Sequence, residues 1–143
     1  MGFIPIKNPP EFTADVEQWT RETDADGEEM AKNVIEPLLN NDVYLKGEIE
    51  RQERVVLVTL TAAGWSGTAA PYSQTVAVSG VTEQMEPILV SALDDGATEA
   101  AQKAYSKAFG LVSSGTASVG DGTATFKVYK KLEVDIVVGL KGV

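Results

Sequence analysis

Paired carboxylates are the residues of this 143-residue chain that come nearest to catalytic chemistry. Glu133 and Asp135 stand two positions apart, and Asp94 is followed directly by Asp95. Two carboxylates on either side of a glycosidic bond can hydrolyse it. The first pair, however, falls on the solvent side of a predicted half-buried strand, and the second pair precedes a predicted helix, where acids act as caps. We therefore interpret all four as surface or capping residues, and an acidic-site hydrolase is the least favoured function.

The chain contains neither His nor Cys. Histidine is the commonest general acid or base and the commonest ligand of transition metals. The absence of both residue types removes His-dependent triads, thiolate nucleophiles, disulfides and most zinc sites. We expect a protein that is not an enzyme and that needs no cofactor and no metal.

An acidic segment at residues 24–29 could be read as a calcium loop, because oxygen-rich loops suit hard cations. With Asp24 as the first ligand, the glycine required at the sixth position would be Glu29. The bidentate glutamate required at the twelfth position would be Ile35. The segment instead predicts the start of a helix, with acids in the first turn where the helix dipole favours them.

Two large aromatic residues, Trp65 and Tyr72, flank a loop of small residues. Exposed aromatic rings with polar neighbours often hold sugars or protein partners, which makes this pair a candidate binding platform. The alternative is that both rings fold back over the end of a sheet and fill its core. We favour the core interpretation, because large aromatic side chains usually bury most of their area.

Charge is distributed unequally along the chain. Residues 1–54 contain 13 acids and 6 bases, whereas residues 55–143 contain 8 acids and 6 bases, which together give the net charge of −9. An acidic surface repels phosphate backbones, so we expect no nucleic-acid partner. No apolar run approaches the roughly 20 residues that a membrane span needs, and no signal peptide is recognisable. We expect no membrane association.

Residues 1–54 are predicted to form a Pro-rich extended arm followed by a helix from about residue 28 to 54. Pro37 should kink or restart that helix, and Asn40-Asn41 is a second point where it could break. A narrow apolar stripe follows coiled-coil spacing, with Asp42 and Gln52 as polar members. Its apolar residues are Ile35, Leu38, Leu45 and Ile49. The sequence therefore predicts an attachment or oligomerisation segment.

Residues 55–143 are predicted to form a strand-rich domain. Apolar or alternating runs predict strands at 55–61, 72–79, 88–93, 111–119, 123–129 and 132–140. Gly120-Asp121-Gly122 predicts a hairpin between two of them. Asp94-Asp95-Gly96 is expected to cap a helix over 97–109 that ends at Gly110. The fold class is α+β, a largely antiparallel sheet of about six strands covered by one helix.

This domain contains the runs GWSG at 64–67, PYSQTV at 71–76, VSGV at 78–81 and VDIVV at 134–138. Together these runs resemble a module of tail, baseplate and fibre-associated proteins from phages and prophages of Gram-positive bacteria. In the module a closing "VDIPV" strand follows an acidic, Ala-rich helix, and here Val137 replaces the usual proline. The resemblance covers about residues 57–140, and it implies no catalytic or metal site.

The resemblance implies a structural protein of the phage virion. Its partners would be copies of itself, as a homotrimer by analogy with tail fibres and their adaptors, and other tail or baseplate proteins. The rule for parallel coiled coils instead favours a dimer, because Ile stands at positions 35 and 49 of the stripe and Leu at positions 38 and 45. The stoichiometry therefore has two alternatives, trimer and dimer. The alternative function is a host-surface module that binds cell-wall polysaccharide through Trp65 and Tyr72.

Overall fold

The computed structural model describes residues 5–16 and 27–143. The chain divides into two compact units, Met1–Arg51 and Gln52–Val143, which are described separately. The boundary expected from the charge pattern lies after residue 54. The first half of the acidic segment considered as a calcium loop, residues 24–26, lies outside the described residues. No helix in the described ranges combines the length and apolar character that crossing a bilayer requires.

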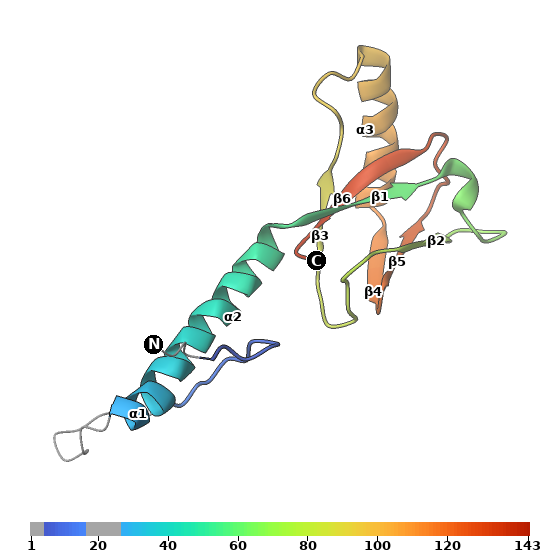
Figure 1. Cartoon of the computed structure of the whole chain (residues 1–143). Coiled ribbons are helices and arrows are strands. Elements are labelled where there is room, and N and C mark those ends of the chain that lie inside the picture. The colour runs from blue at the N-terminus through green and yellow to red at the C-terminus, as the bar shows by residue number, and fades with distance from the viewer. Residues whose placement is uncertain (1–4, 17–26) are drawn as a thin grey trace. The chain divides into compact units, whose positions relative to one another are not determined.

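The first unit is built on one continuous helical run of 27 residues, drawn in blue to green in Figure 1. It consists of α1 (Gly27–Met30), a π-helical turn η1 (Ala31–Ile35) and α2 (Glu36–Glu53). Pro37 does not end the helix. Proline cannot donate a backbone N–H and crowds the preceding turn. The wider π turn lies directly before it, where the Glu36 N–H bonds to the Ala31 carbonyl.

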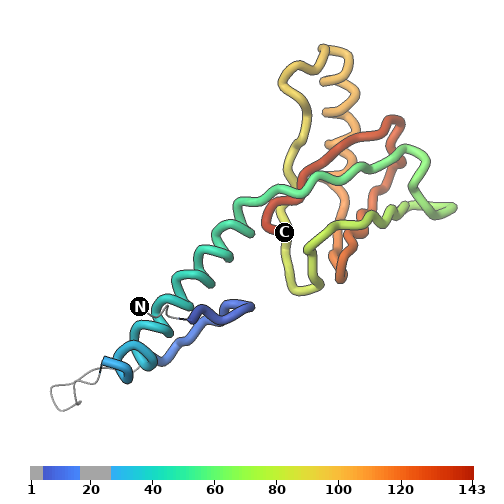
Figure 2. Tube along the Cα trace, in the orientation of Figure 1, coloured from blue at the N-terminus to red at the C-terminus, as the bar shows by residue number. Residues whose placement is uncertain are grey.

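The N-terminal arm is held against α2 by two asparagines in the middle of the helix (Figure 2). The Lys7 N–H donates to Asn40 Oδ1 at 2.7 Å, and Asn40 is buried. Asn41 Oδ1 accepts a hydrogen bond from the Thr13 N–H at 2.6 Å, and Asn41 Nδ2 donates one to the Thr13 carbonyl at 2.9 Å. The two asparagines therefore do not break the helix. They satisfy backbone groups of the arm, whose described residues 5–16 contain no strand.

The second unit is α+β and contains two antiparallel three-stranded sheets. The first sheet has the order β1 (Val55–Leu60), β6 (Ile136–Lys141), β3 (Ile88–Ser91). The second has the order β2 (Tyr72–Ala77), β5 (Thr123–Val128), β4 (Thr116–Gly120). The prediction of one six-stranded sheet is wrong. Strand patterns give the strands but not their partners, and two sheets facing each other bury more apolar surface than one sheet under a single helix.

One hydrophobic core joins the inward faces of both sheets and α3 (Glu99–Ser113). The predicted alternation is confirmed on β5, where every second residue is buried. On the predicted strand 132–140, Leu132 is buried but Val134 is exposed, because the strand itself begins only at Ile136. The buried apolar residues include Leu60, Ala108, Val112, Ala124, Phe126, Val128, Ile136, Val138 and Leu140.

The helix α3 differs from its prediction at both ends. Its N-cap is Thr98, whose side chain accepts from the Ala101 N–H, and not the Asp94-Asp95-Gly96 segment. That segment forms a turn in which Asp94 accepts from the Gly96 N–H at 2.7 Å. The helix also continues past Gly110 to Ser113, so residues 111–113 are not strand. Val112 is buried in the core, and this burial favours another helical turn over termination at the glycine.

The turn between β4 and β5 is the predicted hairpin. Asp121-Gly122 connects the two strands, and Gly122 has a φ of 71°. A positive φ is accessible to glycine without steric cost, which explains the Asp-Gly step. Residues 62–64 form a short 3-10 turn, η2 (Ala62–Gly64), that leads from β1 toward the loop containing Trp65.

Candidate functional site

The predicted oligomerisation stripe lies exposed on the helical run, with Ile35 at the end of η1 and the other three residues on α2. The exposed fractions are 39% for Ile35, 50% for Leu38, 48% for Leu45 and 58% for Ile49. Asp42, also exposed, lies within the same stripe. The arm contacts a neighbouring face of the helix through Asn40 and Asn41 and through the Phe12 and Tyr44 rings, whose centroids are 5.9 Å apart. The arm therefore leaves the four apolar side chains uncovered.

A second exposed apolar surface lies in the other unit, on the side of sheet β1-β6-β3 that faces away from the core. We call it the outer face. It consists of Val55, Leu57, Thr59, Ile88, Val90, Val137, Gly139 and Lys141. Leu57 is 63% exposed and Ile88 is 65% exposed, values far above those of ordinary sheet residues facing a core. Contiguous exposed apolar residues of this kind mark interaction surfaces.

Gly139 lies at the centre of the outer face, between Leu57 on β1 and Val90 on β3. A Cβ at this position would meet Val90 Cγ2 at 2.6 Å and Val55 Cγ1 at 2.7 Å. Val55 and Val90 therefore fill the space that a side chain at position 139 would occupy. The middle strand, β6, contributes no side chain at the centre of the outer face. Glycine within a strand often marks a place where another chain approaches closely.

The second sheet, β2-β5-β4, has a polar face on its side away from the core, in contrast to the apolar outer face of the first sheet. The side of β2-β5-β4 away from the core carries hydroxyl groups, and Thr75 and Thr125 join across the strands at 2.8 Å between their Oγ1 atoms. Ser118 lies beside Thr125 on the next strand. Apolar exposure therefore distinguishes the outer face of the first sheet from the corresponding face of the second.

Trp65 and Tyr72 are not equally placed. Trp65 is 4% exposed and belongs to the core, so its ring presents no surface to a sugar. Tyr72 is partly buried, and the Lys131 ammonium lies 4.8 Å from its ring centroid. The loop between them is closed by an antiparallel bridge between Ser66 and Ser73. A platform of two exposed rings is not formed.

The paired carboxylates take part in structural contacts. Glu133 accepts from Lys107 at 2.7 Å, and Lys130 lies 3.7 Å away. The Lys107 hydrogen bond, followed by the positive charges of Lys107 and Lys130, lowers the pKa of Glu133 below its ordinary value. Asp135 receives the Ala62 backbone N–H at 2.7 Å. A carboxylate held ionised by a lysine is unsuited to donate a proton, which is what a glycosidase acid must do.

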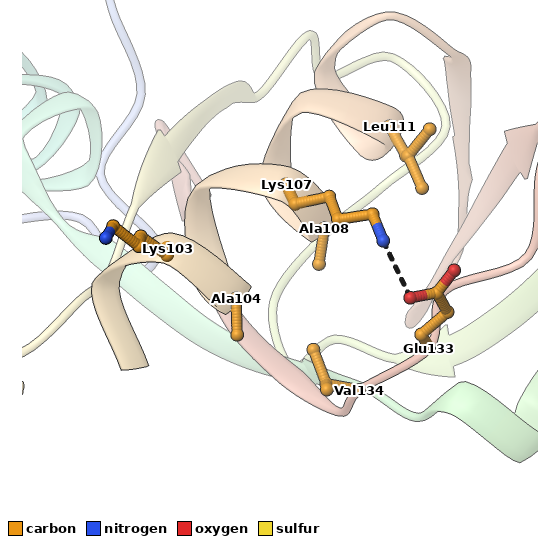
Figure 3. A pocket seen from close by; sticks show the side chains of 7 residues that line it. All are labelled: Lys103, Ala104, Lys107, Ala108, Leu111, Glu133 and Val134. Atoms are coloured by element: carbon orange, nitrogen blue, oxygen red, sulfur yellow. Dashed lines mark hydrogen bonds and ion pairs between the residues drawn. The ribbon is translucent and has the colours of Figure 1, made fainter. Parts of the chain in front are cut away.

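A pocket of about 280 Å³ lies beside the Lys107–Glu133 ion pair (Figure 3). Its lining residues are Lys103, Ala104, Lys107, Ala108, Leu111, Glu133 and Val134. Lys103 pairs with Glu99, so both lysines of the pocket already have carboxylate partners. Within residues 5–16 and 27–143, no three Asp or Glu side chains are grouped so as to hold a metal ion.

Sequence reasoning did not identify the outer face, although the chain carries a signal for it. Val55-Val56-Leu57-Val58 and Ile136-Val137-Val138 are apolar at successive positions. A strand covered on one side only should alternate, whereas a continuous apolar run is typical of strands covered on both sides. Both runs therefore indicated a second covered face. No pattern in the sequence indicated that Asn40 and Asn41 would bind the backbone of the arm.

Comparison with protein-family models, with curated proteins and with solved structures finds no match for this chain.

Proposed function

We propose that this protein is a structural subunit that assembles with copies of itself, as a homotrimer, in the tail, baseplate or fibre region of a phage particle. The observation that supports it best is the exposed stripe Ile35, Leu38, Leu45 and Ile49 on a 27-residue helical run. Leaving four large apolar side chains in water is unfavourable by about 25 cal/mol for each Å² that could be buried. Contact with another protein surface recovers that free energy.

The placement in a phage particle is supported by the resemblance of residues 57–140 to tail and baseplate modules. It also agrees with the contacts of the carboxylates, which serve as ion-pair partners and turn acceptors. In this proposal the protein acts by assembly and performs no chemical step. The protein would contact copies of itself and other proteins of the particle through the apolar stripe and through the strand-rich domain.

Mass spectrometry of purified particles tests the placement. Particles from the phage, or from the induced lysogen, that carries this gene should contain the protein in a fixed ratio to a known tail protein. The ratio should survive a density gradient and a high-salt wash. If the protein is present in the lysate but absent from the washed particles, the placement in the virion is wrong.

A further inference from the structure

The outer face of sheet β1-β6-β3 needs a covering partner, and the stripe on α2 needs one as well. Both are apolar and both are exposed among the described residues. Each carries a single charged residue, but the charges are opposite: Asp42 lies in the stripe and Lys141 in the outer face. We infer that the stripe of one copy packs on the outer face of the next copy. This inference rests on the proposed self-assembly and names its two contacting surfaces.

The charges favour this pairing over the two symmetric ones. Packing stripe against stripe would bury Asp42 residues with no base, and packing outer face against outer face would bury Lys141 residues with no acid. Burying a charge without a partner is strongly unfavourable, whereas complementary charges at an interface fix the partner and the register. A stripe on an outer face buries one acid and one base in each contact.

The dimensions of the two surfaces also fit. Three adjacent strands span about 10 Å between the outer strand axes, which is close to the diameter of a helix. Figure 1 labels the three strands, with β6 between β1 and β3. Gly139 leaves the middle strand without a side chain and Val55 and Val90 close over it, so no bulky central side chain holds a helix away from the outer face.

The register follows from the charged pair. Lys141 lies between Val55 and Ile88 at one end of the outer face, and Val137 lies four residues back, about 13 Å along the strand. From Asp42 to either end of the stripe is seven residues, about 10 Å of helix. With Asp42 beside Lys141, one half of the stripe therefore covers Leu57, Val90 and Val137.

A contact between two different surfaces of the same chain is heterologous, and it closes into a ring when the rotation between copies permits. Three copies joined in this way would cover three outer faces, each with one half of the stripe of a neighbouring copy. The pairing is therefore compatible with the proposed trimer, and it explains why a stripe too short for a coiled coil can still assemble.

Cysteine cross-linking tests the pairing, because the natural chain contains no Cys. Full-length Asp42→Cys and Lys141→Cys chains, carrying tags of different length, are produced together and oxidised. The expected product is a disulfide-linked dimer of one chain of each kind, identified by its mass. Glu50→Cys on α2 and Lys127→Cys on β5 are the controls, since both positions are exposed. A chain that carries either control cysteine should form only weak disulfide cross-links with the Asp42→Cys and Lys141→Cys chains.

Charge reversal gives an independent measurement. Lys141→Glu should weaken self-association about tenfold, and combining it with Asp42→Lys should restore most of the loss. Lys127→Glu, on the hydroxyl-bearing face, should have no such effect. An oligomeric protein that forms disulfides only between two Asp42→Cys chains, or no mixed disulfide, overturns this pairing and leaves self-assembly standing. A monomeric natural chain overturns both.

Discussion

Trp65 shows how one side chain decides between two interpretations of a loop. It is 4% exposed and packs with the residues that join the two sheets. Its aromatic neighbour Tyr72 is paired with Lys131 at the edge of the same loop. The ring therefore stabilises the fold, and a surface for sugars would have to be made by other residues.

Replacing Trp65 by alanine should lower the free energy of unfolding by about 3–5 kcal/mol, because a buried ring leaves both lost contacts and a cavity. Urea denaturation monitored by far-UV circular dichroism measures it. Tyr129→Ala is the matched control, since this ring is 71% exposed and its loss should change stability by about 0.5 kcal/mol or less. A Trp65→Ala chain as stable as the natural one would mean that the ring does not fill the core.

Glu133 should titrate at a lower pH than an ordinary glutamate, because Lys107 donates to its ionised form. A folded-state pKa below the unfolded value means that the ion pair stabilises the fold above about pH 4.5. That contribution is lost as the pH falls through the folded-state pKa. NMR titration of the Glu133 carboxyl carbon follows the change directly. Lys107→Met should raise the pKa of Glu133, and Lys103→Met, in the same pocket, should leave it where it is.

Among the elements, the strands and the Asp-Gly hairpin were predictable because their signals are local. Alternating burial on β5 and the positive φ of Gly122 both follow from neighbouring residues. The pairing of β1 with β6 joins residues about 80 positions apart, and no local pattern specifies it. The same limit explains why one six-stranded sheet was expected. The outer face was different, because the apolar runs at 55–58 and 136–138 are a local signal for it.

Two glycines near the end of α3 should respond in opposite ways to alanine. Gly110 lies inside the helix with open space around it, so Gly110→Ala should stabilise the protein by about 0.5–1 kcal/mol. Gly115 lies just past the helix, where a Cβ would collide with the Lys127 carbonyl. Gly115→Ala should therefore destabilise it by about 1–3 kcal/mol. Thermal unfolding of the two variants decides this, and an equal effect of both would contradict the described packing.

The arm should loosen when its asparagines are removed. The Thr13 N–H is bonded to Asn41 Oδ1, so its exchange with deuterium should be slowed in the natural protein. Asn41→Ala should speed that exchange about tenfold, the effect of losing one to two hydrogen bonds of ordinary strength. NMR detection of the amide gives the rate. Glu50→Ala, at an exposed position of the same helix whose side chain pairs with Lys46, is the control and should leave the Thr13 rate unchanged.

At the scale of the whole molecule, the candidate site was only partly predictable. The stripe on α2 was visible in the spacing of Ile35, Leu38, Leu45 and Ile49, because helical periodicity is a property of the sequence. Its exposure in the folded chain was not, since exposure depends on what the arm covers. The second surface lies on a sheet whose composition is set by strand pairing. The proposed assembly buries apolar side chains of both the stripe and the outer face.

Light scattering coupled to gel filtration tests the proposed self-assembly most directly. At micromolar concentration the full-length chain should elute with three times the mass of a single chain. Leu38→Gln combined with Leu45→Gln should reduce this to the mass of one chain without loss of helical signal, because both side chains are already exposed in the isolated fold. Lys46→Gln with Glu50→Gln, exposed on α2 outside the stripe, is the matched control and should remain trimeric. A dimeric mass would contradict the proposed stoichiometry, and a single-chain mass for the natural protein would contradict self-assembly itself.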